Sequence, residues 1–161
     1  MSHTENVNAI VRQLVLRKQT LAFAESCTGG LISHWVTQLP GVSAVFRGSV
    51  IAYHEDLKED LLEVSGSVIE QFGMTSIQTA GEMARGARSV CRSDWALSTT
   101  GIAGPSGGDE DNPVGTVCFF ISGPQLEREA RMVFAGDRRS VQKQASEWAL
   151  NWLMKTVTGQ N

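Results

Sequence analysis

Helix-like and strand-like segments alternate along this chain of 161 residues, and this alternation limits the folds that the chain can adopt. The first segment, residues 5–18, has apolar side chains at helical spacing: Val7, Ile10, Val11, Leu14 and Val15. Residues 20–25 have the pattern of a short strand, and residues 31–38 are apolar enough for a helix. The proline and glycine at positions 40–41 then indicate a turn.

The same alternation continues in the middle of the chain. Residues 45–53 are rich in β-branched and aromatic side chains, which is typical of a strand. Residues 54–64 carry leucines at helical spacing, and capping-box patterns at 67–70 and 75–78 indicate two helix starts. The helix that runs to about Cys91 is expected to bury one face, made of Ala80, Met83, Ala84 and Ala87.

Three further strands and a helix complete the pattern. Strands are predicted at residues 95–100, 114–122 and 127–134, and the last two form a hairpin. Asp137 is a good N-cap for the final helix. The buried face of that helix is expected to be Val141, Ala145, Trp148, Ala149, Trp152 and Leu153. The order α-β-α-β-α-α-β-β-β-α predicts one α/β domain over residues 1–161 (core about 5–157), a three-layer α/β/α sandwich with a mixed sheet.

Composition excludes several classes of protein. Hydrophobic residues make up 42% of the chain and charged residues 19%, which indicates a globular protein. A net charge of −3 without a basic run disfavours nucleic-acid binding, so we expect no nucleic-acid partner. No apolar stretch is long enough for a membrane span and no secretory signal is recognisable, so we expect a cytoplasmic protein without a membrane partner. The wide spacing of Cys27, Cys91 and Cys118 predicts neither a disulfide framework nor a metal site.

The first candidate for chemistry is the segment AESCTGG, residues 24–30. Glycines after a strand allow a tight turn and the close approach of a ligand. The following helix is expected to present free N–H groups, which favour an anion such as a phosphate or a developing oxyanion. Ser26, Cys27 and Thr28 are possible nucleophiles or ligand donors. A purely structural turn is the alternative, because the segment matches neither a dinucleotide-binding nor a P-loop pattern.

The second candidate is the loop at residues 101–113, which is rich in glycine and proline. Long loops of this kind inside small domains are often binding loops. Its acidic part, residues 109–111, matches no calcium-binding pattern and is interpreted as a solvated turn.

Two cationic side chains are further candidates. Lys58 can serve as a general base if burial lowers its pKa, and a Ser–Lys pair is a known way to activate a hydroxyl. Its acidic neighbours equally suit an exposed, ion-paired lysine. Arg138, at the start of the last helix, can bind a phosphate or carboxylate through two parallel hydrogen bonds.

Taken together, the motifs AESCTGG, Tyr-x4-Lys, GIAGPxGG…PVGTV and F-x-GDR resemble those of the C-terminal domain family of CinA (competence/damage-inducible) proteins. The resemblance extends from about residue 5 to residue 157. That family includes stand-alone enzymes that deamidate nicotinamide mononucleotide to nicotinate mononucleotide and ammonia. The resemblance therefore implies a small-molecule nucleotide as substrate, no metal, no cofactor, and a homodimer or higher homo-oligomer.

The resemblance also implies roles for individual residues. Ser26 would be the nucleophile, Lys58 its base, and Tyr53 an assisting group, while Arg138 is a candidate for the 5′-phosphate. The substrate-binding residues that it implies are Thr28, Gly29, Gly30, Thr100, Gly101, Ala103, Gly104, Gly107, Gly108 and Arg138.

Four positions depart from the pattern that the family often shows: Glu55, Ile77, Ser106 and Gln142. Related sequences often carry an asparagine, a glutamate, an acidic residue and an arginine at these positions. A negative charge at Glu55, if it lies close, would raise the pKa of Lys58 and oppose its role as a base. An alternative function is therefore a catalytically inactive member that binds nucleotides or a protein partner.

Overall fold

The sheet has five strands and mixed directions, in the order β2-β1-β3-β4-β5, in a computed structural model that describes residues 1–160. The strands are β1 (Leu21–Glu25), β2 (Phe46–Ile51), β3 (Trp95–Gly101), β4 (Thr116–Gly123) and β5 (Leu126–Val133). Strand β1 pairs in parallel with β2 and β3, whereas β4 is antiparallel to both β3 and β5. The predicted hairpin is β4–β5.

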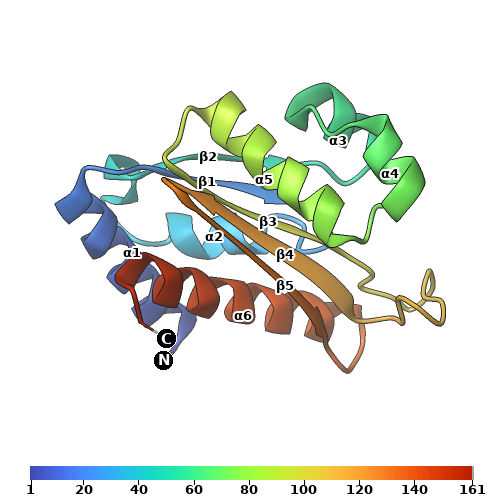
Figure 1. Cartoon of the computed structure of the whole chain (residues 1–161). Coiled ribbons are helices and arrows are strands. Elements are labelled where there is room, and N and C mark those ends of the chain that lie inside the picture. The colour runs from blue at the N-terminus through green and yellow to red at the C-terminus, as the bar shows by residue number, and fades with distance from the viewer. Residues whose placement is uncertain (161) are drawn as a thin grey trace.

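Helices cover both faces of the sheet (Figure 1). One face packs against α1 (His3–Arg17), α2 (Leu31–Thr37) and α6 (Arg138–Thr158). The other face carries α3 (Glu55–Leu62), α4 (Gly66–Phe72) and α5 (Ile77–Cys91). The predicted three-layer α/β/α architecture is confirmed. None of the helices in residues 1–160 is long and apolar enough to cross a membrane.

The two faces of the sheet are packed differently. Against α1, α2 and α6 the core contains large apolar side chains such as Phe23, Leu97 and Phe119. Against α5 the contacts are made mainly by alanines and Met83, and the predicted buried face of this helix is confirmed. Helix α5 also approaches α3 closely at Gly86, because a Cβ there would lie 1.9 Å from the carbonyl oxygen of Leu62.

The sequence analysis was wrong about details between β2 and β3. The predicted element order has two helices between these strands, whereas the structure has three, one for each of the three segments with helical signals, and neither predicted capping box forms. Helix α4 starts after Ser65, because the Ser65 carbonyl accepts its first helical hydrogen bonds, and Ser67 lies within the helix. Helix α5 is capped by the side chain of Ser76, one residue later than predicted, and its partner is the N–H of Thr79.

The fold brings the candidate motifs to one edge of the sheet. Strands β1, β2 and β3 run in the same direction, so their carboxyl ends lie side by side at Glu25, Ile51 and Gly101. The turn of residues 26–30 and the glycine-rich loop both begin there. Ligands of open α/β sheets commonly bind outside the carboxyl ends of parallel strands.

Candidate active site

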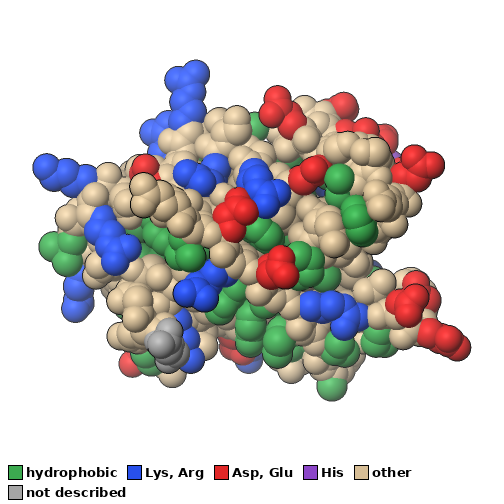
Figure 2. All heavy atoms as spheres, viewed as in Figure 1, with side chains coloured by type: hydrophobic (Ala, Val, Ile, Leu, Met, Phe, Trp, Pro, Cys, Tyr) green, Lys and Arg blue, Asp and Glu red, His purple; other side chains and the backbone are tan. Residues whose placement is uncertain are grey.

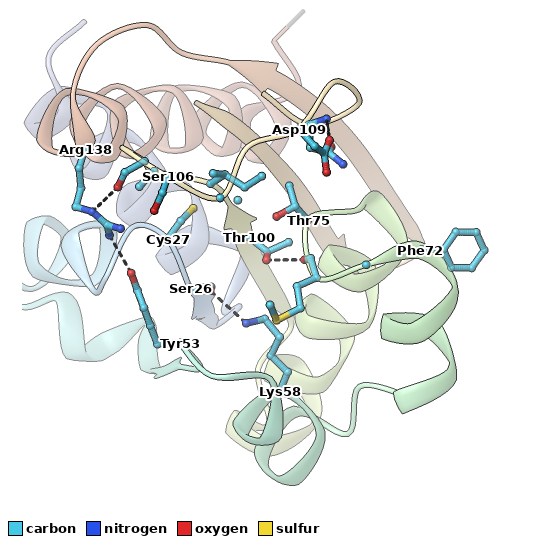
Figure 3. A pocket seen from close by; sticks show the side chains of 18 residues that line it. Ser26, Cys27, Tyr53, Lys58, Phe72, Thr75, Thr100, Ser106, Asp109 and Arg138 are labelled. Carbon is cyan, nitrogen blue, oxygen red and sulfur yellow. Dashed lines mark hydrogen bonds between the residues drawn. The ribbon is translucent and has the colours of Figure 1, made fainter. Parts of the chain in front are cut away.

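A cavity of about 420 Å³ opens at this edge of the sheet (Figure 3). Its walls come from the β1–α2 turn, the β2–α3 connection, the α4–α5 connection, the loop after β3 and the start of α6. The predicted site residues that line it are Ser26, Tyr53, Lys58, Thr100, Gly101, Ala103, Gly104, Gly107 and Arg138. Segments far apart in the sequence therefore meet around one cavity.

The side chains of Ser26 and Lys58 meet at the floor of this cavity. The Lys58 Nζ atom donates a hydrogen bond to Ser26 Oγ at 3.2 Å and another to the carbonyl oxygen of Ala52 at 2.9 Å. Lys58 is only 1% exposed, and it makes no ion pair within residues 1–160. Of the two interpretations of Lys58, the structure shows the buried one.

Helix α3 separates Lys58 from its acidic neighbours. The carboxylates of Glu55, Asp56, Glu59 and Asp60 are exposed, and Figure 2 shows acidic side chains gathered over this helix. Burial lowers the pKa of Lys58 below its ordinary value, and this effect outweighs the opposing charge of Glu55. Glu55 therefore raises the pKa of Lys58 as expected, but the net change in this pKa is a decrease. A neutral amine is what a general base requires.

The turn that carries Ser26 is fixed by backbone geometry. The Ser26 N–H donates to the Thr99 carbonyl at 3.0 Å, and the Gly29 N–H donates to the Ser26 carbonyl at 3.0 Å. Gly29 and Gly30 have φ angles of 62° and 93°, a region that L side chains rarely adopt. The two glycines of the motif therefore serve the turn itself.

The N-terminus of α2 is occupied by the chain's own Glu25. The Glu25 carboxylate accepts hydrogen bonds from the N–H groups of Gly30 (3.1 Å), Ile32 (3.3 Å) and Ser33 (2.8 Å). The expectation of free N–H groups for an external anion was therefore wrong. Sequence reasoning missed the role of Glu25, although an acidic residue just before a helix start is a recognised signal for such a contact.

Four predicted substrate-binding residues do not line the cavity: Thr28, Gly29, Gly30 and Gly108. Thr28 is buried, and its hydroxyl lies 2.7 Å from Glu25 Oε2 and 2.8 Å from the Thr99 hydroxyl. Gly108 packs against the loop, where a Cβ would lie 2.6 Å from the Val114 nitrogen.

Arg138 lies at one side of the cavity, next to Tyr53 (Figure 3). Its Nε atom donates to the Gly104 carbonyl at 2.8 Å, and Nη1 donates to the Tyr53 hydroxyl at 2.9 Å. The Tyr53 hydroxyl is thus directed at Arg138 rather than at Lys58. A guanidinium has five N–H donors, so Arg138 retains donors for an anion.

The α4–α5 connection was not predicted as part of the site. Gly73, Met74 and Thr75 line the cavity, and the Thr100 hydroxyl donates to the Met74 carbonyl at 2.7 Å. Asp109 also lines the cavity, although the acidic turn was interpreted only as solvated. No spacing in the sequence indicates these residues, because tertiary contacts alone bring them there.

The positions that depart from the family pattern lie mostly outside the cavity lining. Only Ser106 lines it, whereas Glu55 lies in the first turn of α3 and Ile77 begins α5. Gln142 reaches from α6 to the turn of residues 26–30, where its Nε2 atom donates to the Cys27 carbonyl at 2.9 Å. The lining is therefore less altered than the sequence suggested.

Residues 1–160 contain no group of three or more histidine, cysteine or acidic side chains that could hold a metal ion. The three cysteines are free thiols, and burial raises the pKa of Cys27 to about 12 and that of Cys118 to about 11. Cys27 follows Ser26 directly and lines the cavity, but its thiol stays protonated at neutral pH and is a poor nucleophile. Ser26 is the better candidate.

The sequence and the fold are both similar to those of known proteins. Residues 3–157 match the CinA C-terminal domain family. CinA-like proteins of Pseudothermotoga lettingae and Fervidobacterium nodosum are 40% and 42% identical over 150 residues, which are 93% of this chain and 37% of each relative. The chain thus spans little more than a third of the length of these relatives.

Solved structures match over nearly the whole chain. A competence-damaged protein (CinA) superfamily protein from Enterobacter cloacae has a TM-score of 0.94 at 28% identity, over 98% of this chain and 93% of that one. The competence/damage inducible protein CihA from Agrobacterium tumefaciens has a TM-score of 0.92 at 32% identity, over 97% and 95%.

Proposed function

This chain belongs to the CinA C-terminal domain family, and on that premise we propose that it is an amidohydrolase. The proposed substrate is nicotinamide mononucleotide, and the proposed products are nicotinate mononucleotide and ammonia. One observation carries the proposal: Lys58 is buried in the cavity without an ion-pair partner in residues 1–160, and its Nζ atom lies 3.2 Å from Ser26 Oγ. Burial of an unpaired amine beside a hydroxyl is costly, and such arrangements are typical of activated nucleophiles.

In the proposed first step, Ser26 Oγ attacks the carbonyl carbon of the carboxamide, and neutral Lys58 accepts the hydroxyl proton. A tetrahedral oxyanion forms. Its candidate donor is the N–H of Cys27, which follows the nucleophile directly and has no backbone acceptor within residues 1–160. Lys58 then gives the proton to the amide nitrogen, the C–N bond breaks, and ammonia leaves behind a serine ester.

In the proposed second step, a water molecule attacks the ester carbonyl while Lys58 accepts one of its protons. The C–O bond to Ser26 breaks, and the proton returns to Ser26 Oγ. The balance of the two steps is one amide and one water consumed, and one carboxylic acid and one ammonia released. No metal or cofactor is needed for this chemistry.

The substrate's phosphate is proposed to bind at Arg138. The N-terminus of α2 is filled by Glu25, so the free donors of Arg138 are the better candidate for an anion at the cavity. The loop of Gly101, Ala103, Gly104 and Gly107 approaches the ligand closely because it has few side chains.

The experiment is a measurement of ammonia release from nicotinamide mononucleotide at neutral pH, with Ser26→Ala as the matched control. We expect release by the wild type and none by the variant. Calorimetric binding of the nucleotide without ammonia release would instead support the alternative, an inactive nucleotide-binding domain. If the folded protein neither binds the nucleotide nor releases ammonia, both nucleotide-based functions are contradicted, and the remaining alternative is an inactive domain that binds a protein partner.

A further inference from the structure

Glu25 is a fully buried acid that the proposed mechanism does not use. It is the last residue of β1 and immediately precedes Ser26. Its carboxylate accepts three backbone hydrogen bonds from the start of α2 and two more from the hydroxyls of Thr28 and Ser33. No lysine, arginine or histidine within residues 1–160 forms an ion pair with it.

The partners of Glu25 enclose the nucleophile turn. These partners lie at positions 28 to 33, so their hydrogen bonds to the Glu25 carboxylate hold the turn that contains Ser26. The Thr28 hydroxyl extends this network to the Thr99 hydroxyl on β3 at 2.8 Å, and the Thr99 carbonyl accepts the Ser26 N–H. The position of Ser26 Oγ therefore depends on the same set of bonds.

We propose that Glu25 is the positioning residue of the nucleophile: its carboxylate holds the turn of residues 26–30 so that Ser26 Oγ stays within hydrogen-bond reach of Lys58. This inference rests on the proposed Ser26–Lys58 chemistry. Glu25 does not line the cavity, so it acts through the turn and touches no substrate. Displacing a reacting atom by about 1 Å can cost about a hundredfold in rate, which is the effect expected from loosening the turn.

A second carboxylate in the same sheet provides a matched control. Asp94 precedes β3 at the opposite end of the central strands, and its Oδ2 atom accepts hydrogen bonds from the N–H and hydroxyl of Thr20 at 2.7 and 2.9 Å. Glu25→Gln and Asp94→Asn both remove a carboxylate that binds backbone N–H groups. Only the first is expected to disturb Ser26.

The experiment measures the rate at which a small sulfonyl fluoride modifies Ser26, detected by mass spectrometry, with Ser26→Ala as the unlabelled control. We expect Glu25→Gln to slow labelling about a hundredfold and Asp94→Asn to leave it unchanged. Equal labelling rates in the two variants would overturn the positioning role. Ser33→Ala removes only one hydroxyl that donates to the Glu25 carboxylate, so it should slow labelling less than Glu25→Gln. It replaces Glu25→Gln as the test variant if Glu25→Gln does not fold.

A second readout does not depend on reactivity. The pKa of Lys58, followed by NMR with isotope-labelled lysine, should rise toward the ordinary value in Glu25→Gln, because a loosened turn admits water. Loss of a negative charge alone would lower this pKa, so a rise identifies the loss of positioning. An unchanged or lowered Lys58 pKa would overturn the inference. Absence of ammonia release in a wild type that shows these effects would contradict the proposed substrate and not the role of Glu25.

Discussion

At both the amino and the carboxyl ends of the central strands β1 and β3, a carboxylate accepts hydrogen bonds from backbone N–H groups, but the surroundings of the two carboxylates differ. At the amino end, Asp94 binds Thr20, and the buried Trp95 donates its indole N–H to Gln19; Gln19, Thr20 and Asp94 are half-buried. At the carboxyl end, Glu25, Ser26 and Lys58 are at most 7% exposed, and Lys58 has no counter-ion in residues 1–160.

The two ends thus differ in how deeply their polar groups are buried, and burial of polar groups has a cost in stability. Burying polar groups is costly unless every donor and acceptor finds a partner, and an unpaired amine is the costliest of them. The amino end avoids this cost because its polar groups remain half-buried. The carboxyl end bears this cost, which is consistent with the role proposed for the Lys58 amine and the Ser26 hydroxyl.

The largest expected effect is at Ser26. Ser26→Ala should reduce ammonia release by about 10⁴-fold or more, because no other nucleophile of suitable pKa lies beside Lys58. The melting temperature should hardly change, since the one hydrogen bond of Ser26 Oγ to residues 1–160 is that from Lys58. Steady-state kinetics and thermal denaturation of the same preparations measure both. A variant that retained wild-type turnover would remove Ser26 from the mechanism.

Lys58→Met is expected to lower kcat by about 10² to 10⁴-fold, which is the usual contribution of a general base. Methionine has a similar length and no basic nitrogen, so the cavity keeps its shape while the proton acceptor is lost. The matched control is Lys143→Met on the exposed face of α6, which should leave kcat unchanged. Equal rates for the two variants would show that Lys58 is not the base.

Arg138→Met should raise KM for the mononucleotide about 10- to 100-fold, with a smaller effect on kcat, because hydrogen bonds to a charged group contribute about 1.5–3 kcal/mol. Tyr53→Phe sharpens this prediction, since the Tyr53 hydroxyl contacts Arg138 and not Lys58. Its effect should likewise fall on KM. A loss confined to kcat would instead assign Tyr53 to proton transfer.

The pH dependence of the wild type reports on Lys58. The base works as the neutral amine, so kcat/KM should fall about tenfold per pH unit below the Lys58 pKa. Because burial lowers this pKa, the decline should begin below about pH 10.4, the ordinary lysine value. A profile whose decline began at the ordinary value would mean that the amine is solvated in solution.

The free energy of unfolding should also depend on pH through the titration of Lys58. Between the lowered pKa of folded Lys58 and its ordinary value, the unfolded chain binds more protons than the folded chain. The free energy of unfolding therefore rises with pH through this window, and Lys58→Met should lack that rise. Urea denaturation over a pH series compares the two proteins.

The smallest effect on activity is expected at the amino end. Asp94→Asn should lower the free energy of unfolding by about 1–3 kcal/mol, because the carboxylate that accepts hydrogen bonds from the N–H and the hydroxyl of Thr20 is replaced. Turnover by the folded protein should not change. Denaturation and ammonia release together test this, and a large loss of turnover would erase the distinction between the two ends.

Helical periodicity predicted most of the fold because buried faces repeat along the sequence. The buried alanines of α5 follow directly from their spacing, as do Val141, Ala145, Ala149 and Leu153 of α6, whereas Trp148 and Trp152 are only half-buried. Periodicity failed at α4, where hydrogen bonds to the backbone of Ser65 decide the helix start. It also failed at Val15, which is half exposed because α1 buries only Val7, Ile10 and Leu14 among its apolar residues.

The identity of the site residues could be predicted from sequence motifs, whereas their burial and their contacts could not, because these depend on the tertiary structure. Ser26, Lys58 and Arg138 stand in recognisable motifs, and the structure brings them to one cavity. The burial of Lys58 could not be deduced, because its acidic neighbours suit an exposed lysine equally well. The contacts of Glu25 were missed because the helix start was considered as a site for an outside anion.

The close approach of α5 to α3 has a consequence for this lysine. Leu62 lies one helical turn after Lys58, and its carbonyl leaves no room for a Cβ at Gly86. A side chain at position 86 would displace α3 from α5, and we expect this displacement to move the Lys58 amine away from the Ser26 hydroxyl. Gly86, which has no side chain and lies outside every motif, thus permits the close packing of α5 against α3, the helix that carries Lys58.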